Sequence, residues 1–66
     1  MGKGQNPRYE KHQFPYESIE AESEKGAKVR FSDEKVEWLP KSQIEIHDNI
    51  EMVEMPAWLA EDKGLM

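Results

Sequence analysis

The sequence predicts a small, mainly β domain that ends in a short helix. After residue 13, apolar and polar residues alternate in short runs, which is the pattern of half-buried strands. Turn-forming residues separate these runs, and the last run leads into a helix over residues 57–63 that proline opens and glycine closes. We therefore expect five antiparallel strands, in a strongly bent sheet or a small barrel, with a C-terminal helix.

Length and composition limit the function. The chain has 66 residues and no cysteine. A chain of this size forms one domain with a small core and has no room for an active-site cleft. Without cysteine, neither disulfides nor a thiolate zinc site can stabilise it, and a reducing compartment is favoured. No apolar run approaches the roughly 20 residues of a bilayer span, and no signal-peptide core is present. We expect a cytoplasmic, non-enzymatic protein without cofactors.

The charge is acidic and uneven. The chain carries 14 acidic and 9 basic side chains, for a net charge of -5, and the basic excess lies near the N-terminus. Residues 1–13 combine glycine, proline and polar side chains, which predicts a flexible arm ahead of a single domain over residues 14–66. The acidic body disfavours nucleic acid and favours a basic protein partner through electrostatic steering.

Strands are predicted over residues 19–23, 27–31 and 36–38. A loop over residues 24–26 pairs Ala21 with Val29. A second loop over residues 32–35 pairs Val29 with Trp38, so we expect Trp38 to be a core anchor.

The same register matches charges on the solvent face of these strands. It places Glu22 opposite Lys28. It also places Arg30 between Glu20 and Glu37. A slip by one residue would bring charges into the core, which favours this register.

The remaining elements follow from turn signals. Pro40 ends the third strand, and residues 41–43 form a single tight turn. A fourth strand over residues 44–46 pairs with a fifth over residues 50–55, across a turn at Asp48-Asn49.

The helix has signals at both ends. Pro56 takes its first position, Gly64 closes it, and Leu65 makes the C-terminal hydrophobic contact. Trp58 and Leu59 would dock it on the sheet, although Trp58 has a second reading as part of a partner interface.

The stretch Glu37–Ile44 reads EWLPKSQI, a tryptophan strand, a proline-led turn and the start of the next strand. It resembles the end of SH3-like barrels, in which these features flank a shallow peptide groove. The resemblance implies an SH3-like barrel with a binding surface at the turn.

Over residues 21–65 the chain also resembles a family of small proteins encoded by phages, prophages and other mobile elements. The matching residues are Ala27–Val29, Trp38–Ile44, Trp58–Ala60 and Lys63–Leu65. The resemblance implies a viral or mobile-element setting in a bacterial or archaeal cell and no particular chemistry.

The candidate partner-binding residues are Lys41, Ser42, Gln43, Trp58, Met52 and Met55. The turn residues are polar, as any turn requires, and methionine suits both core gaps and adaptable contact surfaces. The buried face of the fifth strand stays open, since either Ile50 and Met52 or Val53 and Met55 are exposed. An exposed pair would favour a homodimer.

Three functions fit these observations. The first is a phage-type accessory protein that binds a protein partner, such as a host nucleic-acid-binding or defence protein. The second is a single-strand nucleic-acid-binding module that uses Lys28, Arg30 and Lys41. The third is a structural subunit whose arm orders in an assembly. We expect no metal site, because His12 and His47 have no further ligand at metal-binding spacing.

Overall fold

The structure is a computed structural model that describes residues 9–66. The strands in this part of the chain are β1 (Lys11–Pro15), β2 (Ser18–Glu22), β3 (Gly26–Ser32), β4 (Lys35–Pro40), β5 (Glu45–His47) and β6 (Met52–Pro56). The 3₁₀ turn η2 (Lys41–Gln43) joins β4 to β5, and the helix α1 (Ala57–Asp62) follows β6. The predicted mainly β class with a short C-terminal helix is confirmed.

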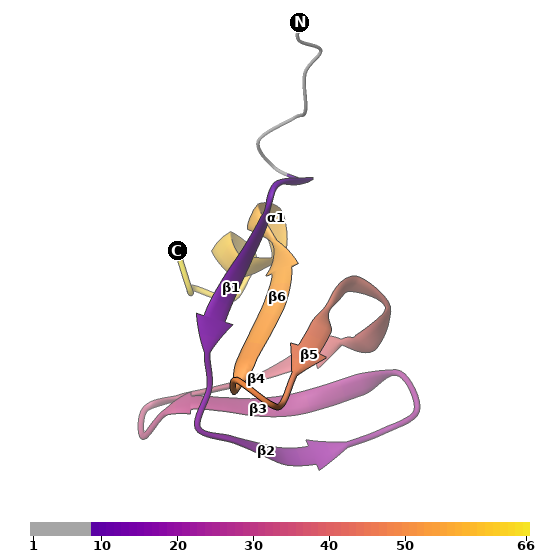
Figure 1. Ribbon diagram of the computed structural model, residues 1–66, viewed down its shortest axis with the longest axis vertical. Coiled ribbons are helices and arrows are strands. Elements are labelled where there is room, and N and C mark those ends of the chain that lie inside the picture. Colours follow the sequence, from indigo (N-terminus) through magenta and orange to yellow (C-terminus); the bar gives the residue numbers. More distant parts are fainter. Residues whose placement is uncertain (1–8) are drawn as a thin grey trace, which may run out of the picture.

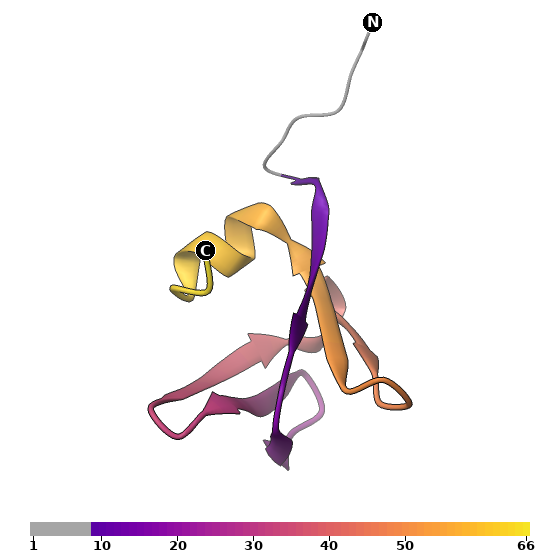
Figure 2. The same cartoon turned by 60° about the vertical axis from the view of Figure 1, so that its left-hand side comes forward.

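The strands form two antiparallel sheets rather than one. The first sheet has the order β1-β6-β5, and the second has the order β2-β3-β4. The two sheets cross each other, and α1 lies over the open side of the space between them (Figures 1 and 2). The chain returns to the first sheet through η2, which therefore lies where the two sheets meet.

The core lies between the sheets and under α1. Its largest fully buried side chains are Leu39, Met55, Val29 and Val53. Leu59 and Ala60 of α1 pack into the same cluster. Full burial of one large apolar side chain contributes roughly 1.5–3 kcal/mol. Because both sheets and the helix share one cluster, each depends on the others for stability.

Strand β1 corrects the predicted boundary of the arm. Composition assigns residues 11–13 to a flexible segment, but they pair with β6 along their whole length. The backbone amide of Ala57 also donates to the carbonyl of Glu10 at 2.9 Å. The strand contains one large apolar side chain, Phe14, so its sequence shows no alternation of apolar and polar residues. Backbone pairing with β6 holds the strand in place. The first eight residues of the predicted arm lie outside the described residues.

The register of β2 with β3 differs from the prediction. Val29 pairs with Ile19 rather than with Ala21, and a β-bulge follows Ile19. The side chain of Ser23 accepts a hydrogen bond from the Gly26 amide at 3.0 Å, which closes the turn one residue earlier than expected. The bulge absorbs the extra residue, and Ala21 is exposed to solvent.

The register of β3 with β4 is also shifted. Ser32 pairs with Lys35, so the turn has two central residues instead of the predicted four-residue loop. Trp38 therefore lies opposite Lys28 on the outer face and is 48% exposed. The prediction that Trp38 is a core anchor is wrong, because its neighbour Leu39 takes the buried position at 1% exposure.

The shifted register changes some of the predicted ion pairs. Arg30 contacts Glu20 at 2.8 Å, as predicted. Glu22 forms an ion pair with Lys41, at 2.9 Å, and not with the predicted partner Lys28. Glu37 pairs with Lys35, at 3.2 Å, rather than with Arg30.

The Glu20–Arg30 pair should make stability depend on acid. Hydrogen bonds from Arg30 and then from Ser18 lower the pKa of Glu20 from its ordinary value of 4.5. A lowered folded-state pKa adds stability above the ordinary pKa, and this stability is lost as the pH falls through the lowered value. We expect Glu20→Gln to reduce the loss of stability in acid, as measured by urea denaturation at several pH values.

Glu24→Gln is the matched control, because Glu24 is an exposed turn residue. If both variants show the same acid dependence as the unchanged chain, the Glu20 contact does not contribute to stability.

The start and end of α1 follow the predicted signals with small shifts. Pro56 ends β6 in extended conformation and precedes the helix rather than forming its first residue, and the helix ends at Asp62. Gly64 has a φ of 75°. The amide of Leu65 donates to the carbonyl of Ala60 at 2.7 Å, and that of Gly64 donates to Glu61 at 3.1 Å. This pair of bonds is a Schellman motif, which confirms the predicted glycine terminus.

Gly64→Ala should destabilise the domain by about 1–2 kcal/mol, because a Cβ atom disfavours the left-handed conformation. The added Cβ would also lie 2.8 Å from the Nζ atom of Lys35, which is a flexible group that can move. Gly64→Asn should cost less, since asparagine tolerates positive φ. Thermal and urea denaturation measure both changes. Equal losses for the two variants would argue against backbone strain as the cause.

Candidate functional site

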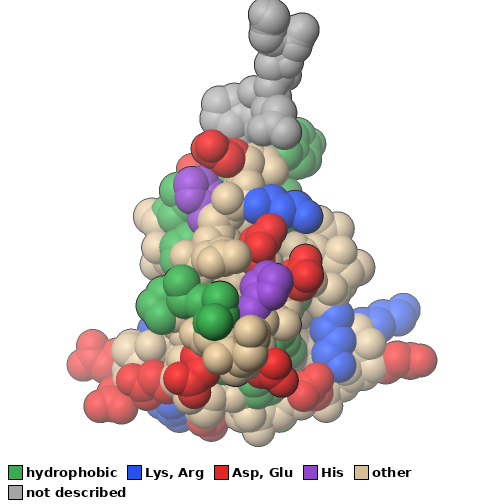
Figure 3. Space-filling model, viewed as in Figure 1, with side chains coloured by type: hydrophobic (Ala, Val, Ile, Leu, Met, Phe, Trp, Pro, Cys, Tyr) green, Lys and Arg blue, Asp and Glu red, His purple; other side chains and the backbone are tan. Residues whose placement is uncertain are grey.

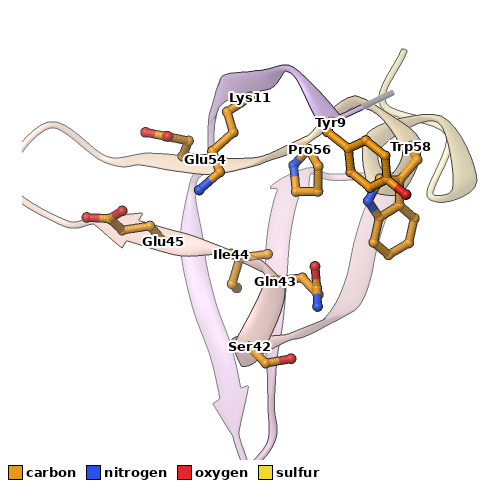
Figure 4. A pocket seen from close by; sticks show the side chains of 9 residues that line it. All are labelled: Tyr9, Lys11, Ser42, Gln43, Ile44, Glu45, Glu54, Pro56 and Trp58. Carbon is orange, nitrogen blue, oxygen red and sulfur yellow. The ribbon is translucent and has the colours of Figure 1, made fainter. Parts of the chain in front are cut away.

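A pocket of about 250 Å³ lies between η2 and the start of α1. It is lined by Tyr9, Lys11, Ser42, Gln43, Ile44, Glu45, Glu54, Pro56 and Trp58. We call it the turn–helix pocket. Figure 4 shows the aromatic rings of Tyr9 and Trp58 at one end and the charged side chains at the other, with Ile44 and Gln43 between them.

The aromatic end is built from two segments that are far apart in sequence. Tyr9 precedes β1 and is 63% exposed. Trp58 is the second residue of α1 and is half-buried, with part of its side chain against the core. Pro56 lacks the amide that would continue the ladder, so β6 ends there and the chain turns into the helix that carries Trp58. The ladder between β1 and β6 brings Tyr9 to the same place.

The turn η2 supplies the polar wall of the pocket. Ser42 and Gln43 are exposed there, and both line the pocket. The backbone amide of Lys41 donates to the carbonyl of Lys25 at 2.8 Å, which fixes the turn against the second sheet. The Lys41 side chain contacts Glu22 and is not part of the pocket lining. The structure thus brings together Ser42, Gln43 and Trp58, three of the six predicted partner-binding residues.

The two methionines of β6 lie apart from this pocket. Met55 is fully buried, as is Val53, so the prediction of Met55 as a partner contact is wrong. The alternation of β6 turns Met52 to the other side, where it is half-buried, and Ile50 just before the strand is 56% exposed. Of the two predicted exposed pairs, the structure therefore selects Ile50 and Met52.

The residues of the nucleic-acid alternative lie around the second sheet, and two of them are already paired. Arg30 contacts Glu20, and Lys41 contacts Glu22. Lys28 lies on the outer face opposite Trp38. The exposed indole of Trp38 is the surface feature that the predicted register concealed.

Two carboxylates and one imidazole come together on the β5–β6 ladder, and the two glutamates line the charged end of the pocket. Glu45 and Glu54 are directly opposite each other in the register. The Nε2 atom of His47 lies 3.2 Å from Oε1 of Glu54 and 4.0 Å from Oε2 of Glu45. From β1, Gln13 donates a hydrogen bond to the same Glu54 oxygen at 3.2 Å. The hydrogen bond from Gln13 and then the one with His47 lower the pKa of Glu54.

We expected no further candidate ligand for His47 at metal-binding spacing, whereas the structure places two carboxylates within 4.0 Å of its Nε2 atom. Glu45 is two residues away on the same strand, and Glu54 comes from the neighbouring strand. The predicted pairing of these strands was the available signal, but the sequence did not fix which residues face each other. Tyr9 and Lys11 were also missed, because both were assigned to the arm.

Comparisons of the chain with protein-family models, with curated proteins and with solved structures found no match. Within residues 9–66, no helix has the length and apolar character that crossing a bilayer requires.

Proposed function

We propose that this chain is a non-enzymatic module that binds a partner protein through the turn–helix pocket. The proposal rests on one observation: two aromatic side chains, Tyr9 and Trp58, line the same pocket as the exposed polar residues Ser42 and Gln43. Tyrosine and tryptophan are amphipathic anchors that dominate many protein interfaces. The polar turn can add hydrogen bonds at the rim of such an interface.

The size of the pocket supports a peptide rather than a metabolite. Its volume of about 250 Å³ is smaller than the roughly 300–1,000 Å³ of small-molecule sites. A pocket of this size suits one large side chain of a partner segment that lies across η2. We therefore expect an apolar or aromatic anchor residue in the partner, packed against Trp58 and Ile44.

The charge of the chain supports a basic partner. The net charge is -5, and acidic side chains gather along the lower edge of the face in Figure 3, over the second sheet. Such a surface steers a positively charged protein toward the pocket and repels an acidic one. The resemblance of the Trp38–Ile44 block to mobile-element proteins favours a host nucleic-acid-binding or defence protein as the partner.

A random-peptide display selection against the full chain tests this proposal. The selected peptides should share one large apolar or aromatic residue with lysine or arginine nearby. They should bind less well to the Trp58→Ala chain and less well at high salt. Enriched peptides that bind the variant as strongly as the unchanged chain would contradict the proposal, and so would a selection without enrichment.

A second candidate function is favoured by the outer face of the second sheet. Trp38 is 48% exposed and lies opposite Lys28, a pairing of aromatic and cationic side chains that suits a stacked base. The ion pairs of Arg30 and Lys41 with glutamates oppose this function. Titration with a single-stranded oligonucleotide at two salt concentrations distinguishes the two functions. Tight, salt-sensitive binding that Trp38→Ala abolishes would favour the second.

A further inference from the structure

We propose that Glu45, His47 and Glu54 form a binding site for a divalent transition-metal ion of the Zn²⁺ type. The three side chains project from the β5–β6 ladder, and two of them, Glu45 and Glu54, line the charged end of the turn–helix pocket. The candidate ligand atoms of all three lie within 4.8 Å of one another. One imidazole nitrogen and two carboxylates are a donor set that zinc accepts, with water in the fourth position. This inference is independent of the proposed peptide binding.

The separation between His47 and Glu54 is close to that in a tetrahedral site, and the separation between His47 and Glu45 is longer. Zinc bonds of about 2.0–2.2 Å to nitrogen and oxygen place neighbouring ligand atoms about 3.4 Å apart. His47 Nε2 is 3.2 Å from Glu54 Oε1, and it is 4.0 Å from Glu45 Oε2. Glu45 is the most exposed of the three, so a change of its side-chain rotamer alone can close the remaining gap.

The register of the two strands explains why a cation belongs there. Glu45 and Glu54 lie directly opposite each other, and like charges in this position destabilise a sheet. Nε2 of a neutral imidazole can donate one hydrogen bond, so His47 can bond to only one of the two carboxylates. The negative charges of Glu45 and Glu54 are then still not neutralised. A divalent ion bound to all three groups would neutralise both carboxylates at once.

The surroundings of Glu54 resemble the outer shell of a metal site. Gln13 on β1 donates a hydrogen bond to Glu54 at 3.2 Å and so orients its carboxylate. The side chains of His47 and Glu54 are 27% and 23% exposed, which is partial burial with access to solvent. Lys11 lines the same pocket, and its positive charge opposes the approach of a second cation.

The other histidine provides a matched control. His12 lies 3.6 Å from Glu10, which is the one carboxylate within ion-pair distance of it among residues 9–66. Both histidines show on the face in Figure 3 with acidic side chains beside them. A histidine with one carboxylate should not hold zinc strongly, whereas the cluster with two should.

Isothermal titration of the full chain with Zn²⁺ tests the proposal. We expect one ion per chain. Loss of an outer-shell partner alone weakens metal binding by roughly 10–100-fold, so His47→Gln and Glu45→Gln, which each remove a direct ligand, should weaken it by at least that much. Glu45→Gln changes an exposed side chain, so its effect cannot be attributed to unfolding. His12→Gln should bind zinc as the unchanged chain does, and Lys11→Gln should bind it more tightly.

A spectroscopic readout locates the ion. Zn²⁺ should shift the NMR signals of the His47 ring and leave those of the His12 ring in place. Absence of zinc binding would overturn the proposal. Binding that survives both His47→Gln and Glu45→Gln would also overturn it, because the ion would then be held elsewhere on the chain.

Discussion

Replacing Leu39 with alanine should destabilise the domain by about 2–5 kcal/mol. Leu39 is 1% exposed and lies in the cluster shared by both sheets and α1. The truncation leaves a cavity that the surrounding side chains cannot fill. Domains of this size have roughly 3–5 kcal/mol of stability from their core, so the variant should be largely unfolded at 25 °C. Urea denaturation and the dispersion of NMR signals measure the change.

The neighbouring residue gives the sharpest control for the register. Trp38 is 48% exposed on the outer face, so Trp38→Ala should cost much less than Leu39→Ala even though it removes more atoms. Ile50→Ala changes a surface side chain and should alter stability by no more than about 0.5 kcal/mol. A chain that tolerates Leu39→Ala and unfolds with Trp38→Ala would have the other register.

Replacing Trp58 with alanine should weaken binding of a selected peptide by about 2 kcal/mol or more, which is roughly a 30-fold loss of affinity. Trp58 combines an apolar surface in the turn–helix pocket with support from the core, and such rigid aromatic anchors dominate interfaces. Fluorescence anisotropy of a labelled peptide measures the affinity.

Two further variants separate binding from folding. Gln43→Ala changes an exposed residue of the pocket wall and should weaken binding without changing the unfolding midpoint. Trp38→Ala removes the other tryptophan, which lies outside the pocket, and should leave the affinity unchanged. An affinity that depends on Trp38 and not on Trp58 would place the interface on the second sheet.

The sequence predicted the fold class because its signals are local. Alternation and turn residues located the five predicted strands, and Gly64 marked the end of the helix. Strand β1 was missed because it forms by pairing with β6, which is far away in the sequence. Within the strand itself, Phe14 is the one large apolar residue, so the sequence pattern there is weak.

The predicted registers were shifted for a specific reason, by two residues in β2 before its bulge and by one residue in β4. The contact between Glu20 and Arg30 exists in the structure, but it is also compatible with the predicted register, since a long arginine side chain reaches several neighbours. Charge matching therefore could not detect the bulge after Ile19 or the cap that Ser23 provides. A separate error, the four-residue loop predicted between β3 and β4, placed Trp38 in the core.

The candidate site was predicted in part. Ser42, Gln43 and Trp58 meet in one pocket because η2 and α1 both border the first sheet. Met55 was misplaced because a period of two does not say which set of side chains faces inward. The Glu45–His47–Glu54 group required the register of β5 with β6, which only the folded chain shows.

Chemical-shift mapping of the ¹⁵N-labelled chain with a selected peptide tests the central claim most directly. If the turn–helix pocket binds the partner segment, the largest changes should fall on the Trp58 indole N–H and on the amides of Gln43 and Ile44. Largest changes at Trp38 and Lys28 instead would contradict the claim and assign binding to the outer face of the second sheet.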